Sequence, residues 1–286
     1  TGVLPEGDIP IDLVNRMAKE ASATAARVLT TCIRALDYCP PVDLTFGDYL
    51  RALITADMDL EPEDALNYRT AFISGFRARG IFPAGVRNLS EENLRWQPPT
   101  FPVRPEQIRD MLKSLDLSWD LSTDRRESYS RAESNGFLLW KWLQKLSPAD
   151  AAAIRADLGF YILPEKDMPK EVKMKDGKPV LQIHGVRPAR RINSRNQQSR
   201  DLVVEAVQQF IATDPKTGEN MTHRGGCTLL IDLQNHRIRY AIRKRVGNAT
   251  RIACERQFLR AAAEDSQGYF ENEANREPFA LLHRGV

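Results

Sequence analysis

The chain has 286 residues, of which 42% are apolar and 28% are charged, and its formal net charge is +3. This composition is typical of a globular protein with a sizeable core, and it argues against disordered, collagen-like and coiled-coil classes. No apolar stretch approaches the roughly eighteen residues of a membrane span, so we expect no membrane partner. Four cysteines are too few for a disulfide scaffold. Because the chain begins with Thr1 and not with Met, we expect a piece of a longer polypeptide or a processed product, and we assign no compartment.

The first third of the chain predicts helices. Between Ile11 and Tyr38, apolar residues recur at steps of three and four, as on one face of a long helix: Val14, Met17, Ala21, Ala25, Val28, Cys32 and Leu36. Cys39-Pro40-Pro41 ends this helix, because proline lacks the backbone N–H and disfavours helix in the residue before it.

A second helix is expected after Thr45, because Thr45 and Asp48 have the spacing of a capping box. We expect this helix to bury a set of apolar residues, namely Phe46, Leu50, Leu53 and Ile54. A third helix then carries one apolar face and ends at Gly80, a natural residue for a helix C-terminus. That face consists of Ala65, Tyr68, Phe72 and Phe76.

Between these two helices lies an acidic run, made of Asp57, Asp59, Glu61, Glu63 and Asp64. Its alternate carboxylates are like those of a calcium loop. However, the loop glycine and the closing glutamate are absent, and Tyr68 stands in the glutamate's place. We therefore favour acids that complement the N-terminus of the next helix over a calcium site.

A stiff connector follows at residues 97–105, which hold four prolines. Helices are expected at about 105–116, around the apolar run 137–146, and from Ser147 to Gly159. The last of these has Asp150 in position to complete its N-terminal cap.

Beyond about residue 165 the pattern changes to the alternation of strands, at 180–187 and 201–211. A hairpin is expected from Cys227–Leu233 and Arg237–Arg243, with Asn235 taking the left-handed backbone of the turn. In its second strand, isoleucines and Tyr240 alternate with arginines, which predicts Tyr240 on the apolar face and the arginines opposite. A helix is expected over 250–264.

The predicted fold class is α+β, an N-terminal all-α helical region followed by an antiparallel β-sheet with at least one helix. Three segments are expected. Residues 1–96 form a helical lobe, residues 97–165 form the proline-rich connector and further helices, and residues 166–286 form a basic α+β domain.

The sequence contains no recognisable catalytic motif. It has no His-Glu-x-x-His, no Cys-x-x-Cys, no phosphate-binding glycine loop and no Gly-x-Ser-x-Gly elbow. His223 and Cys227 are four residues apart, but Arg224-Gly225-Gly226 between them is turn-like, which favours an ordinary loop over a zinc site. We therefore predict no catalytic and no metal-binding residue in this chain.

A family resemblance is carried by residues about 20–82. Ile33-Arg34-Ala35-Leu36-Asp37-Tyr38-Cys39-Pro40-Pro41 leads into Leu44-Thr45-Phe46-Gly47-Asp48-Tyr49-Leu50-Arg51-Ala52-Leu53. Ala56-Asp57-Met58-Asp59-Leu60 follows, and then Tyr68-Arg69-Thr70-Ala71-Phe72 with Gly75 and Gly80-Ile81. This segment resembles the C-terminal helical lobe of thermolysin-like zinc metallopeptidases of the gluzincin type. In that family, an Arg-Ala-Leu-like helix end, a Phe-led helix closing on Asp-Leu and an Ala-Phe helix ending at Gly-Ile follow one another.

The resemblance implies a non-catalytic role for this chain. In gluzincin peptidases the zinc helix, the glutamate ligand and the histidine that steadies the transition state all lie N-terminal to this lobe. Metal-assisted hydrolysis needs three protein ligands and a polarised water. The resemblance therefore implies zinc in a preceding N-terminal catalytic part, with that part as the partner of this chain. It implies nothing about residues 100–286.

Charge is divided unevenly along the chain. Residues 178–260 carry sixteen Lys/Arg and six Asp/Glu, a net charge of +10, which leaves −7 on the remainder. The basic half could bind nucleic acid, an acidic protein or the acidic remainder of the same chain, or its arginines could simply be solvated. Specific nucleic-acid modules usually add exposed aromatics, and Tyr240 is expected on the apolar face, which weakens the first interpretation. The candidate binding surface is Arg187, Arg190, Arg191, Arg195, Arg237, Arg239 and Arg243.

Two functions are therefore carried forward. The first is the C-terminal, non-catalytic portion of a larger gluzincin-like zinc metallopeptidase, inactive by itself, with an appended basic α+β domain used for docking. The second is a non-enzymatic binding module whose basic sheet engages nucleic acid or an acidic protein.

Overall fold

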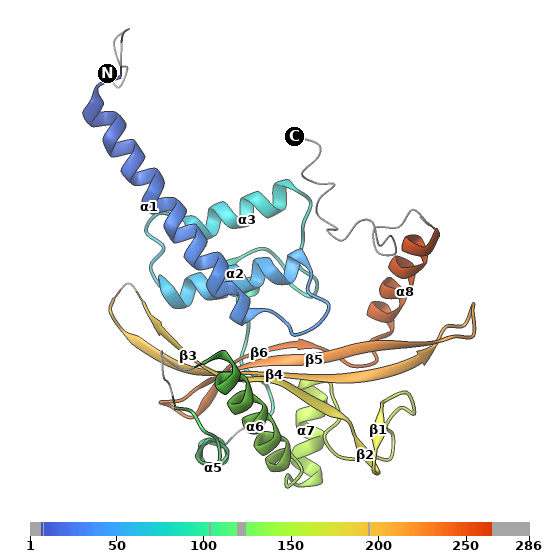
Figure 1. Ribbon diagram of the computed structural model, residues 1–286. Helices are drawn as coiled ribbons and strands as arrows, with labels where there is room; N and C mark the ends of the chain where they lie inside the picture. Colours follow the sequence, from blue (N-terminus) through green and yellow to red (C-terminus); the bar gives the residue numbers. More distant parts are fainter. Residues whose placement is uncertain (1–6, 8, 103, 119–123, 194, 265–286) are drawn as a thin grey trace.

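The computed structural model describes residues 7, 9–102, 104–118, 124–193 and 195–264. A four-stranded antiparallel sheet lies between two layers of helices, with α1, α2 and α3 over one face and α5, α6 and α7 over the other (Figure 1). The expected α+β class, a helical region followed by an antiparallel sheet with a further helix, is confirmed.

The layer formed by the N-terminal part consists of α1 (Ile11–Ala35), a short 3-10 helix (Leu36–Tyr38), α2 (Phe46–Leu60), α3 (Tyr68–Ala78) and α4 (Glu91–Leu94). The capping box at the start of α2 is confirmed. The Asp48 N–H donates to Thr45 Oγ1 at 3.2 Å, and the Thr45 N–H donates to Asp48 Oδ2 at 3.0 Å. None of the described helices is long and apolar enough to cross a bilayer.

The first turn of α2 corrects one expectation. Phe46 is exposed, although the sequence predicts it to be buried. The reason is that Gly47, at the next position, lies against Pro83, so closely that a Cβ on Gly47 would be 2.7 Å from Pro83 Cα. Leu50, Leu53 and other residues of α2 are buried as expected; Phe46 points away from them.

The layer on the opposite face consists of α5 (Pro105–Lys113), α6 (Arg125–Leu143) and α7 (Pro148–Leu158). The predicted cap of α7 is confirmed, since the Asp150 N–H donates to Ser147 Oγ at 3.1 Å. Gly159 ends the helix with a left-handed backbone, at φ 79°. The last helix within the described residues is α8 (Ala249–Glu264).

The sheet has the order β3-β4-β5-β6, and each strand is antiparallel to its neighbour. Its strands are β3 (Leu181–Ile192), β4 (Gln198–Thr213), β5 (Asn220–Asp232) and β6 (Arg237–Lys244), and a small hairpin of β1 (Met174–Lys175) and β2 (Lys178–Pro179) lies beside it. The predicted strands are confirmed and are longer than expected.

The core lies on both faces of this sheet. In β4, Val203 packs on the side of α2, whereas Leu202 and Val204 pack against α5 and α6. A strand that is covered on both faces has a continuous apolar sequence instead of alternating apolar and polar residues. Leu202-Val203-Val204 is such a sequence. The helices α5, α6 and α7 therefore cover the face of the sheet opposite to the one that α1, α2 and α3 cover.

The turn between β5 and β6 corrects a second expectation. His236, not Asn235, adopts the left-handed backbone, at φ 50°. The Asp232 carboxylate accepts the backbone N–H groups of Gln234 and Asn235 and the Asn235 side-chain amide. These hydrogen bonds fix the backbone of Gln234 and Asn235, so the left-handed conformation falls on His236, the next residue.

Candidate functional site

The arginines predicted to form a binding surface face carboxylates of the same chain. Arg187 pairs with Asp37 of the 3-10 helix and, at 3.2 Å, with Glu205 of β4. Arg191 is 3% exposed; it pairs with the same Asp37 at 3.0 Å and with Asp201. Two arginines of β3 are therefore neutralised in the interface between the sheet and the N-terminal helices.

Arg239 of β6 lies in the same interface. Its guanidinium is 2.6 Å from Asp59 Oδ1 and 2.8 Å from Asp201 Oδ2. The hydroxyls of Tyr38 and Tyr240 donate to the two oxygens of Asp59, at 2.6 and 2.9 Å. Burial and the neighbouring carboxylate raise the pKa of both tyrosines, so both hydroxyls remain protonated donors. We call the charged members of this set the interface ion-pair network: Asp37, Asp59, Asp201, Arg187, Arg191 and Arg239.

The position of Arg239 corrects the expected alternation of β6. The sequence predicts Arg239 and Tyr240 on opposite faces, yet both reach the same carboxylate. Leu230 pairs with Tyr240 and Ile231 pairs with Ile238, which leaves Arg239 as the extra residue of a β-bulge. The bulge resets the alternation, so that Tyr240 and Ile238 pack on opposite faces of the sheet.

The other predicted arginines are spread over several surfaces. Further ion pairs join Arg243 to Asp157 of α7, Arg195 to Glu63 and Arg237 to Asp232. Arg190 lies on β3 beside a hollow that Arg200 also lines. Arg187, Arg191, Arg195, Arg237, Arg239 and Arg243 thus each pair with a carboxylate of this chain. Of the partners weighed from the sequence, this arrangement favours the acidic remainder of the same chain.

Burial and neighbouring opposite charges act in opposite directions on the pKa values of this network. Asp201 is 1% exposed, and burial raises its pKa, although Arg239 and Arg191 act in the opposite direction. Burial would also lower the pKa of Arg239, but Asp59 and Asp201 outweigh it and raise that pKa. Sequence reasoning missed the carboxylate half of the network. The available signal was the opposite charge of the two halves of the chain.

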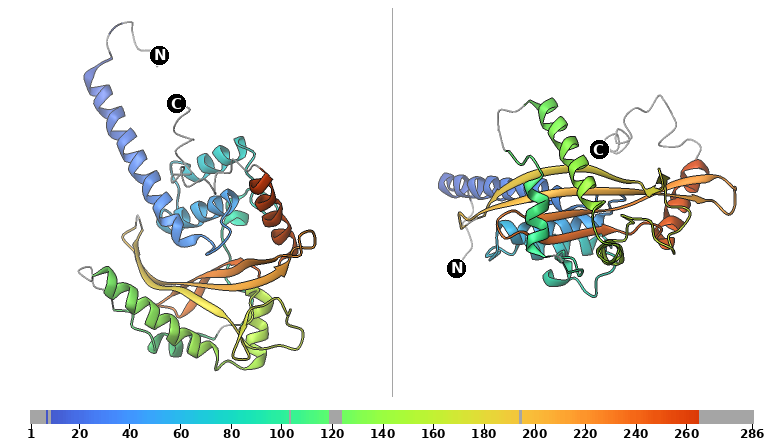
Figure 2. Two further views of the ribbon diagram at one scale, coloured as in Figure 1. Left: turned by 45° about the vertical axis from the view of Figure 1, so that its right-hand side comes forward. Right: turned by 90° about the horizontal axis from the view of Figure 1, so that it is seen from below.

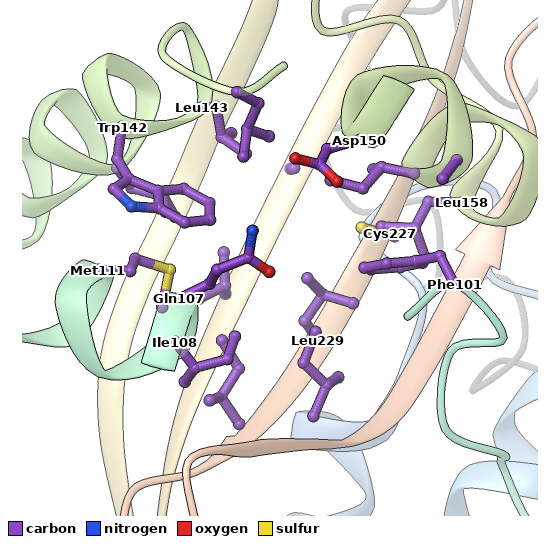
Figure 3. Close-up of a pocket in the computed structure, with 18 of the residues that line it drawn as sticks. Phe101, Gln107, Ile108, Met111, Trp142, Leu143, Asp150, Leu158, Cys227 and Leu229 are labelled. Atoms are coloured by element: carbon purple, nitrogen blue, oxygen red, sulfur yellow. The ribbon is translucent and has the colours of Figure 1, made fainter. Parts of the chain in front are cut away.

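An apolar pocket opens on the other face of the sheet, between α5, α6 and α7 (Figure 3). Its empty volume, which includes the open mouth, is about 810 Å³. Aliphatic and aromatic side chains dominate the lining, among them Phe101, Met111, Trp142, Leu143 and Leu229. No sequence motif predicts this pocket, because its residues come from three helices, four strands and the connector.

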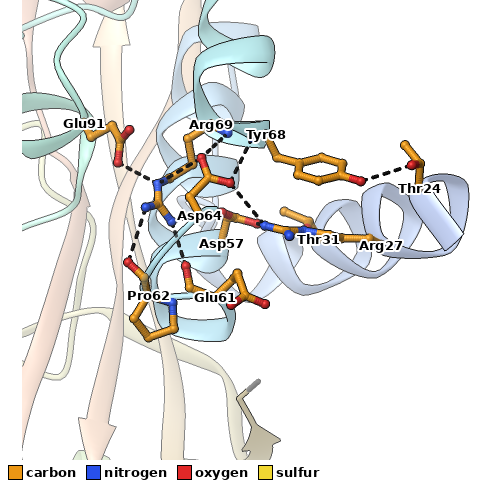
Figure 4. Close-up of polar contacts among 10 residues, drawn as sticks. All are labelled: Thr24, Arg27, Thr31, Asp57, Glu61, Pro62, Asp64, Tyr68, Arg69 and Glu91. Atoms are coloured by element: carbon orange, nitrogen blue, oxygen red, sulfur yellow. Dashed lines mark hydrogen bonds and ion pairs between the residues drawn. The ribbon is translucent and has the colours of Figure 1, made fainter. Parts of the chain in front are cut away.

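Polar contacts also hold the N-terminal helices to one another (Figure 4). Arg69 of α3 is 3.1 Å from Asp57 Oδ2 and 2.6 Å from Glu91 Oε2. Arg27 of α1 reaches Asp57 at 3.5 Å and Asp64 at 3.3 Å. Asp64 also accepts the first N–H groups of α3, which is the helix-terminal role predicted for the acidic run.

His223 and Cys227 do not share a site. Both lie in β5, so the predicted loop between them is instead part of a strand. Four residues of strand separate them by roughly 13 Å. His223 Nδ1 is 2.5 Å from Glu255 of α8, whereas Cys227 is buried against the α7 side of the sheet. Within the described ranges, no group of three His, Cys, Asp or Glu residues is placed to hold a metal ion.

Close packing in the sheet accounts for the two glycines beside Cys227. A Cβ on Gly226 would lie 2.1 Å from the carbonyl oxygen of Ala206, and one on Gly225 would lie 2.7 Å from Val246. The neighbouring backbone approaches so closely that only glycine fits.

The first helix carries an apolar stripe that stays exposed among the residues that the structure describes. Views in two directions show α1 extending beyond the rest of the molecule (Figure 2). One side of its C-terminal half packs on the lobe, burying Thr31 and Ala35. Its exposed apolar residues, together with the first residue of the 3-10 helix that follows, are called the α1 stripe: Ile11, Val14, Met17, Leu29, Ile33 and Leu36. They are 41–69% exposed.

No known protein family matches this chain, and no curated protein and no solved structure matches it. The resemblance of residues 20–82 to gluzincin peptidases therefore stays a prediction.

Proposed function

We propose that this chain is the non-catalytic C-terminal portion of a larger gluzincin-like zinc metallopeptidase. The observation that supports this function is the α1 stripe. A helix of 25 residues with large apolar side chains on its free side needs a cover, because such side chains are normally packed against a neighbouring element. The catalytic part of the parent enzyme would pack on the α1 stripe and cover it.

The geometry of the stripe suits an intramolecular partner. Covering six half-exposed apolar side chains contributes about 1 kcal/mol each. The summed free energy is modest for the association of two separate proteins. It is sufficient for two parts of one chain, because a linker raises the effective concentration of each part at the other. Alanines at 18, 21 and 25 lie along the middle of the stripe, where a partner helix can approach closely.

The lobe has the rigidity that a supporting wall requires. Asp57 and Arg69, both within the segment that carries the family resemblance, form a buried pair between α2 and α3. The interface ion-pair network then joins this lobe to the basic sheet, so the proposed docking role of the basic domain is toward its own lobe. Zinc and its three ligands would belong to the preceding part, and this chain would contribute no reacting group.

The test is to express the chain together with the coding sequence that precedes Thr1. We expect a His-Glu-x-x-His motif there, about one bound zinc per protein and zinc-dependent peptide hydrolysis. Met17→Asp should lower both thermal stability and hydrolysis. Leu66→Asp is the matched control, because Leu66 is 69% exposed outside the stripe. Absence of the motif, or zinc-dependent proteolysis by the present chain alone, would overturn the proposal.

A second candidate function rests on a hollow beside β6. Arg95, Trp96, Arg237 and Arg239 line it, and the Arg237 side chain is 67% exposed. This site favours the binding-module interpretation, with an acidic protein or a nucleic acid as partner. Labelled RNA and an acidic peptide should then bind with an affinity that falls steeply between low and physiological salt, and Arg237→Ala should weaken both. Salt-independent binding would exclude this function.

A further inference from the structure

The pocket between α5, α6 and α7 combines an apolar wall with one pair of polar groups. Of the residues that line it, only Gln107 and Asp150 end in an amide or a charged group. Gln107 belongs to the first turn of α5, and Asp150 belongs to the first turn of α7. Both side chains point into the pocket (Figure 3).

The two groups are held by caps that leave one atom of each for a ligand. Gln107 Oε1 accepts the Arg104 N–H at 3.3 Å, which directs the side-chain NH₂ inward. Asp150 Oδ2 accepts the Ser147 hydroxyl at 2.8 Å. Neither the Gln107 NH₂ nor Asp150 Oδ1 makes a hydrogen bond with any other residue that the structure describes. Gln107 and Asp150 therefore add a donor group and an acceptor atom to an otherwise largely apolar pocket.

We propose that this pocket binds an aliphatic molecule with a neutral hydroxyl or amide end, such as a medium-chain alcohol. The hydroxyl donates its proton to Asp150 Oδ1 and accepts from the Gln107 NH₂, which satisfies both groups at once. The hydrocarbon chain lies on Ile108, Leu143 and Leu229, where burial of each methylene is favourable.

The same pair of groups discriminates against other ligands. A fatty acid would place its carboxylate beside Asp150, and like charges repel strongly in a site that excludes much of the water. A wholly apolar molecule would leave the Gln107 amide and the Asp150 carboxylate partly desolvated without partners. An alkyl amine would satisfy Asp150 but would offer no acceptor to the Gln107 NH₂.

The experiment compares three ligands of one chain length by calorimetric titration of the full chain: n-octanol, octanoate and octylamine. We expect n-octanol to bind at least about tenfold more tightly than octanoate, and more tightly than octylamine. Equal binding of n-octanol and octanoate, tighter binding of octylamine, or no binding of n-octanol would each overturn the proposal.

Two variants test whether n-octanol binds in this pocket. Ala153→Leu should abolish n-octanol binding, because Ala153 is a half-buried lining residue of α7 and leucine preserves the helix. Ala152→Leu is the matched control, a half-buried neighbour on the same helix that does not line the pocket. Asp150→Asn should raise octanoate affinity toward that of n-octanol. Unchanged n-octanol binding in Ala153→Leu, or unchanged discrimination in Asp150→Asn, would contradict the assignment.

Discussion

Replacing Arg239 with methionine tests whether buried charge holds the sheet to the N-terminal helices. The variant keeps most of the side-chain volume but removes the guanidinium from two carboxylates at 2.6 and 2.8 Å. A hydrogen bond to a charged group contributes about 1.5–3 kcal/mol. Asp59 keeps its hydrogen bonds from two tyrosine hydroxyls, and Asp201 keeps its ion pair with Arg191. The loss of stability should therefore lie toward the lower end of the sum for the two lost contacts. We expect a decrease of about 3 kcal/mol in the free energy of unfolding.

Urea denaturation followed by circular dichroism measures this loss, and its pH dependence identifies the cause. In the intact protein, burial raises the pKa of Asp201 and Arg239 lowers it. Removal of Arg239 therefore raises this pKa further. A carboxyl group whose pKa is higher in the folded than in the unfolded state destabilises the fold as pH rises through that pKa. The deficit of the variant should therefore be greatest near about pH 7 and should shrink near about pH 4 to 5.

Arg237→Met is the matched control on the same strand. Arg237 is 67% exposed and lies 3.6 Å from Asp232, so its loss should change stability by less than about 0.5 kcal/mol. If Arg239→Met and Arg237→Met destabilise the protein equally, or if the deficit of Arg239→Met does not depend on pH, the network does not hold the two layers together.

Three further predictions concern the strands, the turn and the lobe. Gly226→Ala should destabilise the protein by at least about 2 kcal/mol in urea denaturation, because the new Cβ would collide with the Ala206 carbonyl oxygen; a neutral result would contradict the close strand approach. Asp232→Ala should cost about 1–2 kcal/mol near neutral pH. Although burial opposes them, hydrogen bonds from the turn lower the pKa of Asp232, so this cost should vanish as pH falls through that pKa; persistence in acid would refute it. Arg69→Met should lower stability by about 3–5 kcal/mol, because it removes the nearer of the two arginines that pair with the buried Asp57; an unchanged melting temperature would contradict this.

Local pattern determined most of the secondary structure. The capping residues Thr45 and Ser147 each place a hydroxyl where the next helix has free N–H groups, and Gly159 ends α7 as expected. These features depend on neighbours within a few residues, which the sequence contains. The change from helical to alternating periodicity likewise located the strands and the α+β class. The expectation for Asn235 failed because the turn is organised by hydrogen bonds to Asp232.

Tertiary structure alone decided the partners of the charged and apolar side chains. The bulge at Arg239 depends on how β6 registers with β5, and register is a property of the pair of strands rather than of either sequence. The pairing of Arg187 and Arg191 with Asp37 joins residues about 150 positions apart. The apolar pocket arises where α5, α6 and α7 meet the sheet. The uneven net charge left attraction between the two halves as one of several possibilities. Only the packing of the helices on the sheet determined which carboxylate meets which arginine, because that choice follows from distances that the order of residues does not contain.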